Sequence, residues 1–320
     1  MKRYCFFTIL ALSLAFAPAN ISAAPKTAAK PAAKKAAKPA AGVISKNPYL
    51  GAIVIDATTG KVLFENQADA QGYPASMLKL IDLLVILDKV NAGQLPLQDK
   101  APVSAKSAKT GGSQVWLAQG ETFTVEDLLY ALMIQSANDS AVALAEKVGG
   151  STEGFVALMN QKAAQLGMTR TKFNSVHGLP PAPGDADDVT TARDFSILCR
   201  QLLLSHPEAL RYTSTRERTF RPGPKQVVMR SHNHLLGSLN GCDGLKTGYI
   251  TKAGYSIAVT ASRNGRRVIA VVLDSVDRVT RDRAAADLVN KGFAALEAAG
   301  PAPVPAAPAP HPAPAAPARK

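Results

Sequence analysis

Hydrophobic and polar positions follow two different periods along residues 43–298, and the changes of period predict the secondary-structure elements. Short apolar runs between turn residues predict strands, and apolar residues that recur every three or four positions predict helices. The expected strands are 50–55, 61–65, 226–229, 254–261 and 268–273, and the expected helices are 76–90, 124–134, 139–148, 152–166, 191–204 and 281–296. Strands at both ends of a helical middle favour an α+β fold in which one sheet draws strands from both chain ends.

The first 23 residues differ from this pattern and are typical of a secretory signal peptide. Lys2 and Arg3 precede an apolar run, Pro18 ends that run, and small residues follow up to Ala24. We expect cleavage after Ala23 or Ala24. The run is short for a ~30 Å hydrocarbon core, so retention as a membrane anchor is the less favoured alternative. Export places the mature protein in the periplasm or elsewhere in the cell envelope.

Two further segments have low complexity. Residues 24–42 contain five lysines, many alanines and prolines, and no acidic residue, which predicts an extended and self-repelling linker. This linker is either a solvated tether or a segment that adheres to an anionic wall polymer or membrane surface. Residues 299–320 are interpreted as a disordered alanine- and proline-rich tail with polyproline II character. The folded part is therefore expected to be a single domain, residues 43–298.

Charge follows the same division. The 320 residues carry a formal net charge of +13, and the segments 1–23, 24–42 and 299–320 hold nine basic residues and no acid. The core therefore carries only +4, which argues against nucleic acid as a partner. Two cysteines remain after residue 23. Cys199 lies in an apolar helical run typical of a buried free thiol, and a bridge to Cys242 stays open because sequence does not give its geometry.

A serine and a lysine three residues apart begin the helix expected over residues 76–90. This spacing places the Ser76 hydroxyl and the Lys79 amine on one helix face. A serine becomes a nucleophile when a base takes its proton, and a lysine is such a base when burial or a nearby positive charge disfavours its ammonium form. The helix start also directs backbone N–H groups toward an oxyanion. The alternative is a helix cap followed by a surface lysine.

A second pair, Ser136 and Asn138, falls in a break between two expected helices. The hydroxyl could relay a proton between a lysine and a leaving group, and the amide could hold a substrate carbonyl. A helix N-cap explains the same two residues equally well.

The third motif is Lys246, Thr247 and Gly248, before the apolar run 254–261. A lysine and a threonine that face a cleft bind a carboxylate, and glycine lets a ligand lie close to a strand backbone. A second Lys-Thr-Gly, residues 109–111, precedes Ser136 and lies in a loop rich in glycine and serine. Order and context therefore favour Lys246.

Taken in this order, the motifs resemble those of penicillin-binding proteins and class A β-lactamases. The sequence around them is similar to the serine D-alanyl-D-alanine carboxypeptidases, the low-molecular-mass penicillin-binding proteins, over about residues 43–298. The similar segments are Pro74-Ala-Ser-Met-Leu-Lys79, Ser136-Ala-Asn-Asp-Ser140, Phe173-Asn-Ser-Val-His-Gly-Leu179 and Asp243-Gly-Leu-Lys-Thr-Gly-Tyr-Ile-Thr-Lys-Ala-Gly-Tyr255. The resemblance implies the penicillin-binding/serine β-lactamase-like fold, an antiparallel sheet packed with helices beside a helical subdomain.

The resemblance also implies roles for individual residues. Ser76 would form an acyl-enzyme after Lys79 takes its proton, and Ser136 would pass a proton to the departing D-alanine. The backbone N–H groups of Ser76 and Tyr249 would form the oxyanion hole, and His177 would be structural. The implied substrates are peptidoglycan stem pentapeptides, and β-lactams are the implied inhibitors. Substrate binding would fall to Asn138, Lys246, Thr247, Gly248, Tyr249 and Arg281.

Other functions stay open at this point. A β-lactamase needs a deacylating base, and no Glu-x-x-Leu-Asn run occurs between residues 140 and 189. A D,D-endopeptidase acting on cross-links would use the same residues, and a non-enzymatic wall-binding protein would use the linker. We expect no cofactor and no metal, since His232 and His234 have no third ligand at zinc spacing. Many family members continue into a C-terminal membrane-anchoring helix, whereas an alanine- and proline-rich tail follows residue 298, so no such helix is expected.

Overall fold

The structure is a computed structural model that describes residues 44–300. The expected signal peptide (1–23), the linker (24–42) and nearly all of the tail (299–320) lie outside the described residues. Within residues 44–300, no helix is both long enough and apolar enough to cross a membrane.

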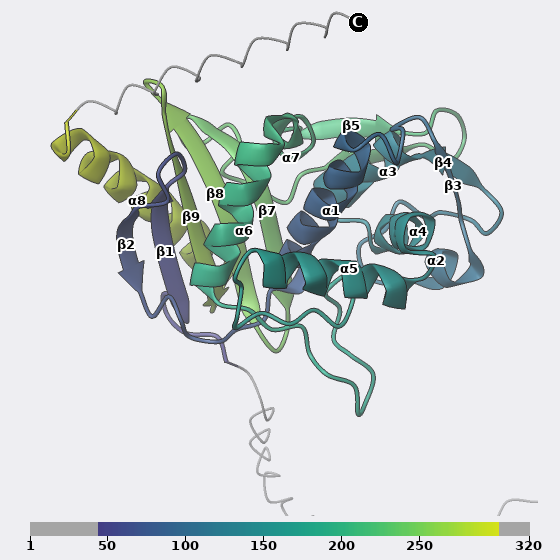
Figure 1. Cartoon of the computed structure of the whole chain (residues 1–320), viewed down its shortest axis with the longest axis horizontal. Helices are drawn as coiled ribbons and strands as arrows, with labels where there is room; N and C mark the ends of the chain where they lie inside the picture. The colour runs from purple at the N-terminus through teal and green to yellow at the C-terminus, as the bar shows by residue number, and fades with distance from the viewer. Residues whose placement is uncertain (1–43, 301–320) are drawn as a thin grey trace, which may run out of the picture. The chain divides into compact units, whose positions relative to one another are not determined.

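A five-stranded antiparallel sheet is the centre of the fold (Figure 1). Its strand order is β2-β1-β9-β8-β7, so strands from the start of the chain pair directly with strands from its end. The prediction of one sheet built from both chain ends is thus confirmed. The strands are β1 (Gly51–Asp56), β2 (Val62–Asn66), β7 (Cys242–Ile250), β8 (Gly254–Arg263) and β9 (Arg266–Ser275).

Helices cover both faces of the sheet, because the sheet residues are apolar on both sides. On one face α8 (Arg278–Ala298) buries Leu288 and Phe293 against strand residues that include Val54 and Val259. On the other face α6 (Ala192–Ser205) packs against β1 and β9. Helix α8 begins three residues earlier than predicted, because the Asp277 side chain caps it by accepting a hydrogen bond from the Thr280 N–H at 2.8 Å.

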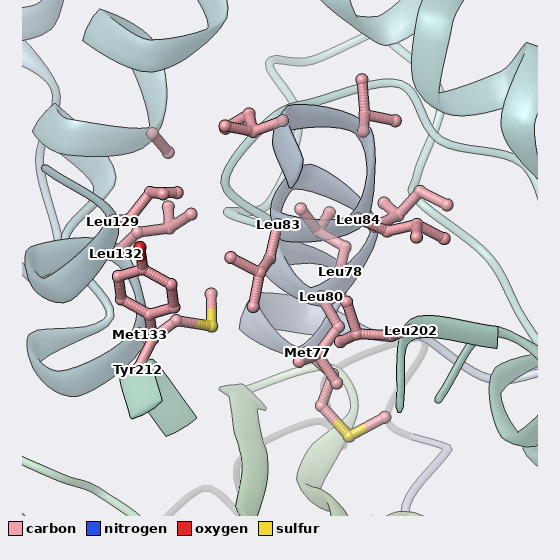
Figure 2. Close-up of a cluster of buried hydrophobic side chains, with 14 of the residues drawn as sticks. Met77, Leu78, Leu80, Leu83, Leu84, Leu129, Leu132, Met133, Leu202 and Tyr212 are labelled. Carbon is pink, nitrogen blue, oxygen red and sulfur yellow. The ribbon is translucent and has the colours of Figure 1, made fainter. Parts of the chain in front are cut away.

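Helix α1 (Lys79–Asn91) runs through the middle of the molecule and is buried on all sides along its first nine residues. A helix that is apolar all round must lie inside a core. Its leucines and the preceding Met77 pack against residues of neighbouring helices such as Leu129, Met133 and Leu202 (Figure 2). This packing fixes the helix whose first turn carries the predicted serine and lysine.

The remaining elements form the helical subdomain and two small two-stranded sheets, β3-β4 and β5-β6. They are α2 (Ala105–Lys109), α3 (Val125–Tyr130), the π-helical turn η2 (Ala131–Gln135), α4 (Asn138–Gly149), α5 (Thr152–Gln165), η3 (Pro207–Ala209), α7 (Leu210–Thr213), β3 (Lys100–Pro102), β4 (Thr122–Thr124), β5 (Glu217–Phe220) and β6 (Val227–Arg230). Residues 124–134, predicted as one helix, form α3 and η2, and the predicted Thr124 cap is present.

Candidate active site

The turn that carries Ser76 is held in a strained backbone. Ser76 lies in the 3₁₀ turn η1 (Ala75–Leu78), and Ala75 before it has a positive φ of 46°. Such a conformation costs a non-glycine residue on the order of 1–3 kcal/mol and persists only when its surroundings impose it. Gly178 presses on this turn, since a Cβ at Gly178 would lie 2.3 Å from the Ala75 carbonyl oxygen. Gly248 of β7 presses from another side, where a Cβ would lie 2.5 Å from the Pro74 oxygen.

Lys79 is completely buried directly beneath Ser76, as the spacing predicted. Its Nζ lies 3.1 Å from Ser76 Oγ, 2.7 Å from Asn138 Oδ1 and 2.8 Å from the His177 carbonyl oxygen. The two oxygens of Asn138 and His177 accept hydrogens from the nitrogen. In a neutral amine the third direction is therefore a lone pair that points at the Ser76 hydroxyl.

The electrostatics of Lys79 give this neutral form a substantial population near neutral pH. Burial, the largest effect, lowers the pKa of Lys79 to about 7. Three carboxyl groups, those of Asp82, Asp188 and Asp139, oppose the shift and hold the pKa from falling further. A lysine of ordinary pKa would be an ammonium ion at this pH and could not accept a proton.

Ser136 and Asn138 form the second wall, in the break that the sequence predicted. Ser136 adopts a left-handed conformation with φ 60°, after η2 and before α4. The Asn138 amide is fully engaged, since Nδ2 also donates to the Gly111 carbonyl at 2.8 Å. Asp139 accepts hydrogen bonds from the Val115 and Leu117 N–H groups. Asn138 and Asp139 therefore fix the 111–117 loop and Lys79 at once.

The third wall is β7, where Lys246 faces the serine of the second motif. Its Nζ donates to Ser136 Oγ at 2.9 Å and to the Thr247 carbonyl at 3.1 Å. Burial lowers the pKa of Lys246 well below its usual value, and the positive charges of Lys79 and Arg281 lower it further. Carboxyl groups raise the pKa of Lys79, whereas no carboxyl group of a described residue offsets the lowered pKa of Lys246. An anion placed beside it would supply the missing partner.

A cavity of about 350 Å³ opens between these walls. Its lining includes six of the nine predicted site residues, and the other three, Lys79, Asn138 and Lys246, lie behind it in the hydrogen-bond network described above. Arg281 is 3% exposed, and its guanidinium donates to Asp282 at 2.6 and 2.9 Å. The lining residues are Ser76, Ser113, Ser136, His232, His234, Thr247, Gly248, Tyr249, Tyr255, Arg278 and Arg281.

Sequence reasoning missed several parts of this site. The His177 contact to Lys79 is made by a backbone carbonyl, which no residue type signals, while the His177 ring accepts from the Leu179 N–H at 3.2 Å. His232 and His234 had been considered only as metal ligands, yet both line the cavity. Among residues 44–300, no group of three or more His, Cys, Asp or Glu side chains is placed to hold a metal.

Two other sequence questions have structural answers. The Lys-Thr-Gly at residues 109–111 begins at Lys109, the last residue of α2; its Gly111 carbonyl accepts from Asn138, and Lys109 is not among the residues that line the cavity. Cys199 is buried and Cys242 is partly exposed, and both are free thiols.

The sheet from both chain ends, its helical cover and the paired serine–lysine contacts define the penicillin-binding-protein and DD-transpeptidase class of fold. The structure superposes on that of penicillin-binding protein D2 from Listeria monocytogenes in its ampicillin-bound form. The TM-score is 0.69 at 34% identity, over 77% of this chain and 97% of that one. The family model for D-alanyl-D-alanine carboxypeptidase matches residues 41–277, and the chain belongs to that family, peptidase S11.

Two relatives are similar in sequence. D-alanyl-D-alanine carboxypeptidase DacC from Escherichia coli K12 is 36% identical over 256 residues, which is 78% of this chain and 62% of DacC. A D-alanyl-D-alanine endopeptidase from Pseudomonas aeruginosa is 32% identical over 235 residues, which is 72% of each chain. This chain therefore spans less than two thirds of the length of its carboxypeptidase relative.

Proposed function

We propose that this protein is a serine-type D-alanyl-D-alanine carboxypeptidase that removes the terminal D-alanine from peptidoglycan stem pentapeptides through an acyl-enzyme on Ser76. One observation carries the proposal: Lys79 is buried 3.1 Å from Ser76 Oγ with two acceptors fixing its other hydrogen-bond directions. In this arrangement the lone pair of the neutral Lys79 nitrogen faces the Ser76 hydroxyl and is placed to accept its proton.

In the acylation step, Lys79 takes the proton of Ser76 as Oγ attacks the penultimate carbonyl. Backbone N–H groups of Ser76 and Tyr249 are assigned to the oxyanion, by similarity to the family. Collapse of the intermediate breaks the C–N bond, and Ser136 passes a proton to the departing amine. Lys246, 2.9 Å from Ser136 Oγ, can replenish that proton. Water then hydrolyses the ester and releases the shortened peptide.

The two lysines have different tasks because their neighbours differ. Burial, and after it the positive charges of Lys79 and Arg281, lower the pKa of Lys246 and disfavour its ammonium form. Binding of a terminal carboxylate at Thr247 and Arg281 would favour its ammonium form. Substrate binding thus charges Lys246, and the added positive charge near Lys79 favours the neutral base.

β-Lactams are proposed as covalent inhibitors that acylate Ser76, in line with the ampicillin-bound form of the Listeria protein. A rapid release of the penicilloyl group, as in a β-lactamase, would need a carboxylate base facing the ester. Asp188 of the 174–188 segment is instead occupied by the Asn174 and Ser175 N–H groups and the Ser175 hydroxyl. We expect the penicilloyl-enzyme to persist.

The deciding experiment is mass spectrometry of the purified protein after incubation with penicillin, together with product analysis on a peptide ending in D-Ala-D-Ala. We expect one added penicilloyl group on the peptide that contains Ser76, and release of free D-alanine. Ser76→Ala should lose both. Labelling of Ser136 or of another serine would show that the nucleophile is wrongly assigned.

The cellular setting is a separate proposal. The basic start and apolar run of residues 1–23 support export to the periplasm or cell envelope. Fractionation of cells with antibody detection tests it, and protein found at full length in the cytoplasm would contradict it.

A further inference from the structure

A second cavity adjoins the catalytic cavity at His234. His234 lines both cavities, and the second, of about 510 Å³, is formed by the β5–β6 hairpin and the turn after it. Arg278 Nη1 donates to His234 Nε2 at 3.1 Å. The other residues lining the second cavity are Arg216, Glu217, Arg230, Ser231, Asn233 and Leu236.

The second cavity presents one arginine with an unmatched charge. Arg230 donates to Glu217 at 2.8 Å, so these two side chains neutralise each other. Within the part of the chain that the structure describes, no carboxylate lies within 4.0 Å of the Arg216 guanidinium. Gly237, which has a φ of 83°, leaves room for this guanidinium, because a Cβ at that position would lie 2.7 Å from Arg216 Nη1. The arginine therefore rests against the backbone with donors available to an anion.

The position of this cavity relative to the reaction indicates which part of a substrate would reach it. In the proposed function, the carboxylate of the departing residue lies at Thr247 and Arg281. The α8 end that carries Arg281 also carries Arg278, which contacts His234. A D-alanine leaving group has only a methyl side chain. Because His234 lines both cavities, a longer side chain on the departing residue that passes His234 would enter the cavity lined by Arg216.

We propose that the second cavity binds the acidic side chain of a departing D-amino acid larger than alanine. The inference rests on the proposed function and uses the same step: the Ser76 Oγ–carbonyl bond forms, the C–N bond breaks, and the departing amine takes its proton through Ser136. Arg216 is then a residue that determines leaving-group specificity. Such a site extends the activity from release of D-alanine toward cleavage of bonds to larger residues, which is the chemistry of a D,D-endopeptidase.

Three peptides that differ only in the last residue test this proposal on the full chain. They end in D-Ala-D-Ala, in D-Ala-D-2-aminoadipate with an acidic side chain, and in D-Ala-D-norleucine with a neutral side chain of similar length. We expect kcat/KM for the acidic residue to exceed that for norleucine about tenfold, as one charge-assisted hydrogen bond would give. The preference should weaken in high salt.

Variants separate a binding site from a general charge effect. Arg216→Gln should abolish the preference, and Arg216→Glu should reverse it, with D-Ala-D-Ala hydrolysis and penicillin labelling unchanged in both. Lys61→Gln removes one positive charge from the distant β1–β2 turn and should leave the preference intact.

Two outcomes overturn the inference and are distinguishable. Equal kcat/KM for aminoadipate and norleucine, or equal losses on all three peptides in Arg216→Gln, would leave the second cavity without a role while the carboxypeptidase function stands. Failure of the wild-type protein to bind penicillin and to hydrolyse any peptide would instead remove the proposed function and this inference with it.

Discussion

The two motif lysines share a side chain but not an environment, and that difference can be measured by replacing each with arginine. Lys79→Arg should lower the rate of penicillin acylation by at least about 10³, because a guanidinium cannot serve as a base. Lys246→Arg keeps a positive group for the carboxylate and should retain part of the acylation rate while mainly raising KM. Stopped-flow acylation and steady-state kinetics check this, and equal, complete loss in both variants would contradict the division of tasks.

The Lys79 pKa of about 7 predicts a pH dependence with a definite sign. Acylation needs the neutral amine, so its second-order rate constant should rise with pH, reach half its plateau near pH 7, and fall below that pH. Asp82→Asn removes a carboxyl group that raises this pKa, so its midpoint should move to lower pH. The Asp82 carboxyl accepts no hydrogen bond from a described residue, which makes the amide a conservative change. A midpoint that is unchanged or higher would show that Asp82 does not act on Lys79.

Among the strands, β7 has a second task besides carrying the third motif. The sequence suggested that Gly248 lets a ligand approach the strand, and Gly248 lines the cavity; the structure shows that it also lets β7 approach the turn that carries Ser76. Gly248→Ala should force β7 and η1 apart and lower acylation about 10²-fold, the effect expected of a misplacement near 1 Å. Gly111→Ala is the matched control, because no atom lies within 4 Å of a Cβ there. Similar losses in both variants would contradict this account.

The sequence predicted most helices and sheet strands, because their apolar periods are clear and some caps, such as Thr124, are made by local side chains. It did not predict β5, whose exposed charged residues give no alternating pattern, or β7 as a strand, whose motif residues interrupt the apolar period. For the site, residue types and order located the three motifs. The left-handed Ala75, the carbonyl of His177 and the second cavity arise from long-range packing, which one sequence does not encode in any local pattern.

For the protein as a whole, we propose that residues 24–42 localise the protein and take no part in its chemistry. Residues 24–42 hold five lysines and no acid, and they precede the described domain. A protein that begins at Gly42 should hydrolyse a soluble D-Ala-D-Ala peptide as fast as the mature chain, because no motif residue is lost. It should sediment less with isolated cell walls or anionic vesicles, and this difference should vanish near 1 M salt, where the Debye length is ~3 Å.

Slow hydrolysis of the soluble peptide by this truncated protein would show that the linker belongs to the catalytic domain. Equal sedimentation at low salt would show that the lysines are only a solvated spacer.

The pairing of β1 with β9 determines at which stage of chain synthesis the site can form. When the chain is synthesised or translocated with its N-terminus first, Ser76 appears early. Lys246 and the edge strand β7 follow about 170 residues later. Strand β9, which joins the two halves of the sheet, appears after them. Because non-local pairings close last, Ser76 has neither the Tyr249 N–H nor the β7 carboxylate site beside it until β7 and β9 have emerged. We therefore expect Ser76 of a partly emerged chain to be unreactive, and reactivity toward acyl donors to begin only after β9 has emerged.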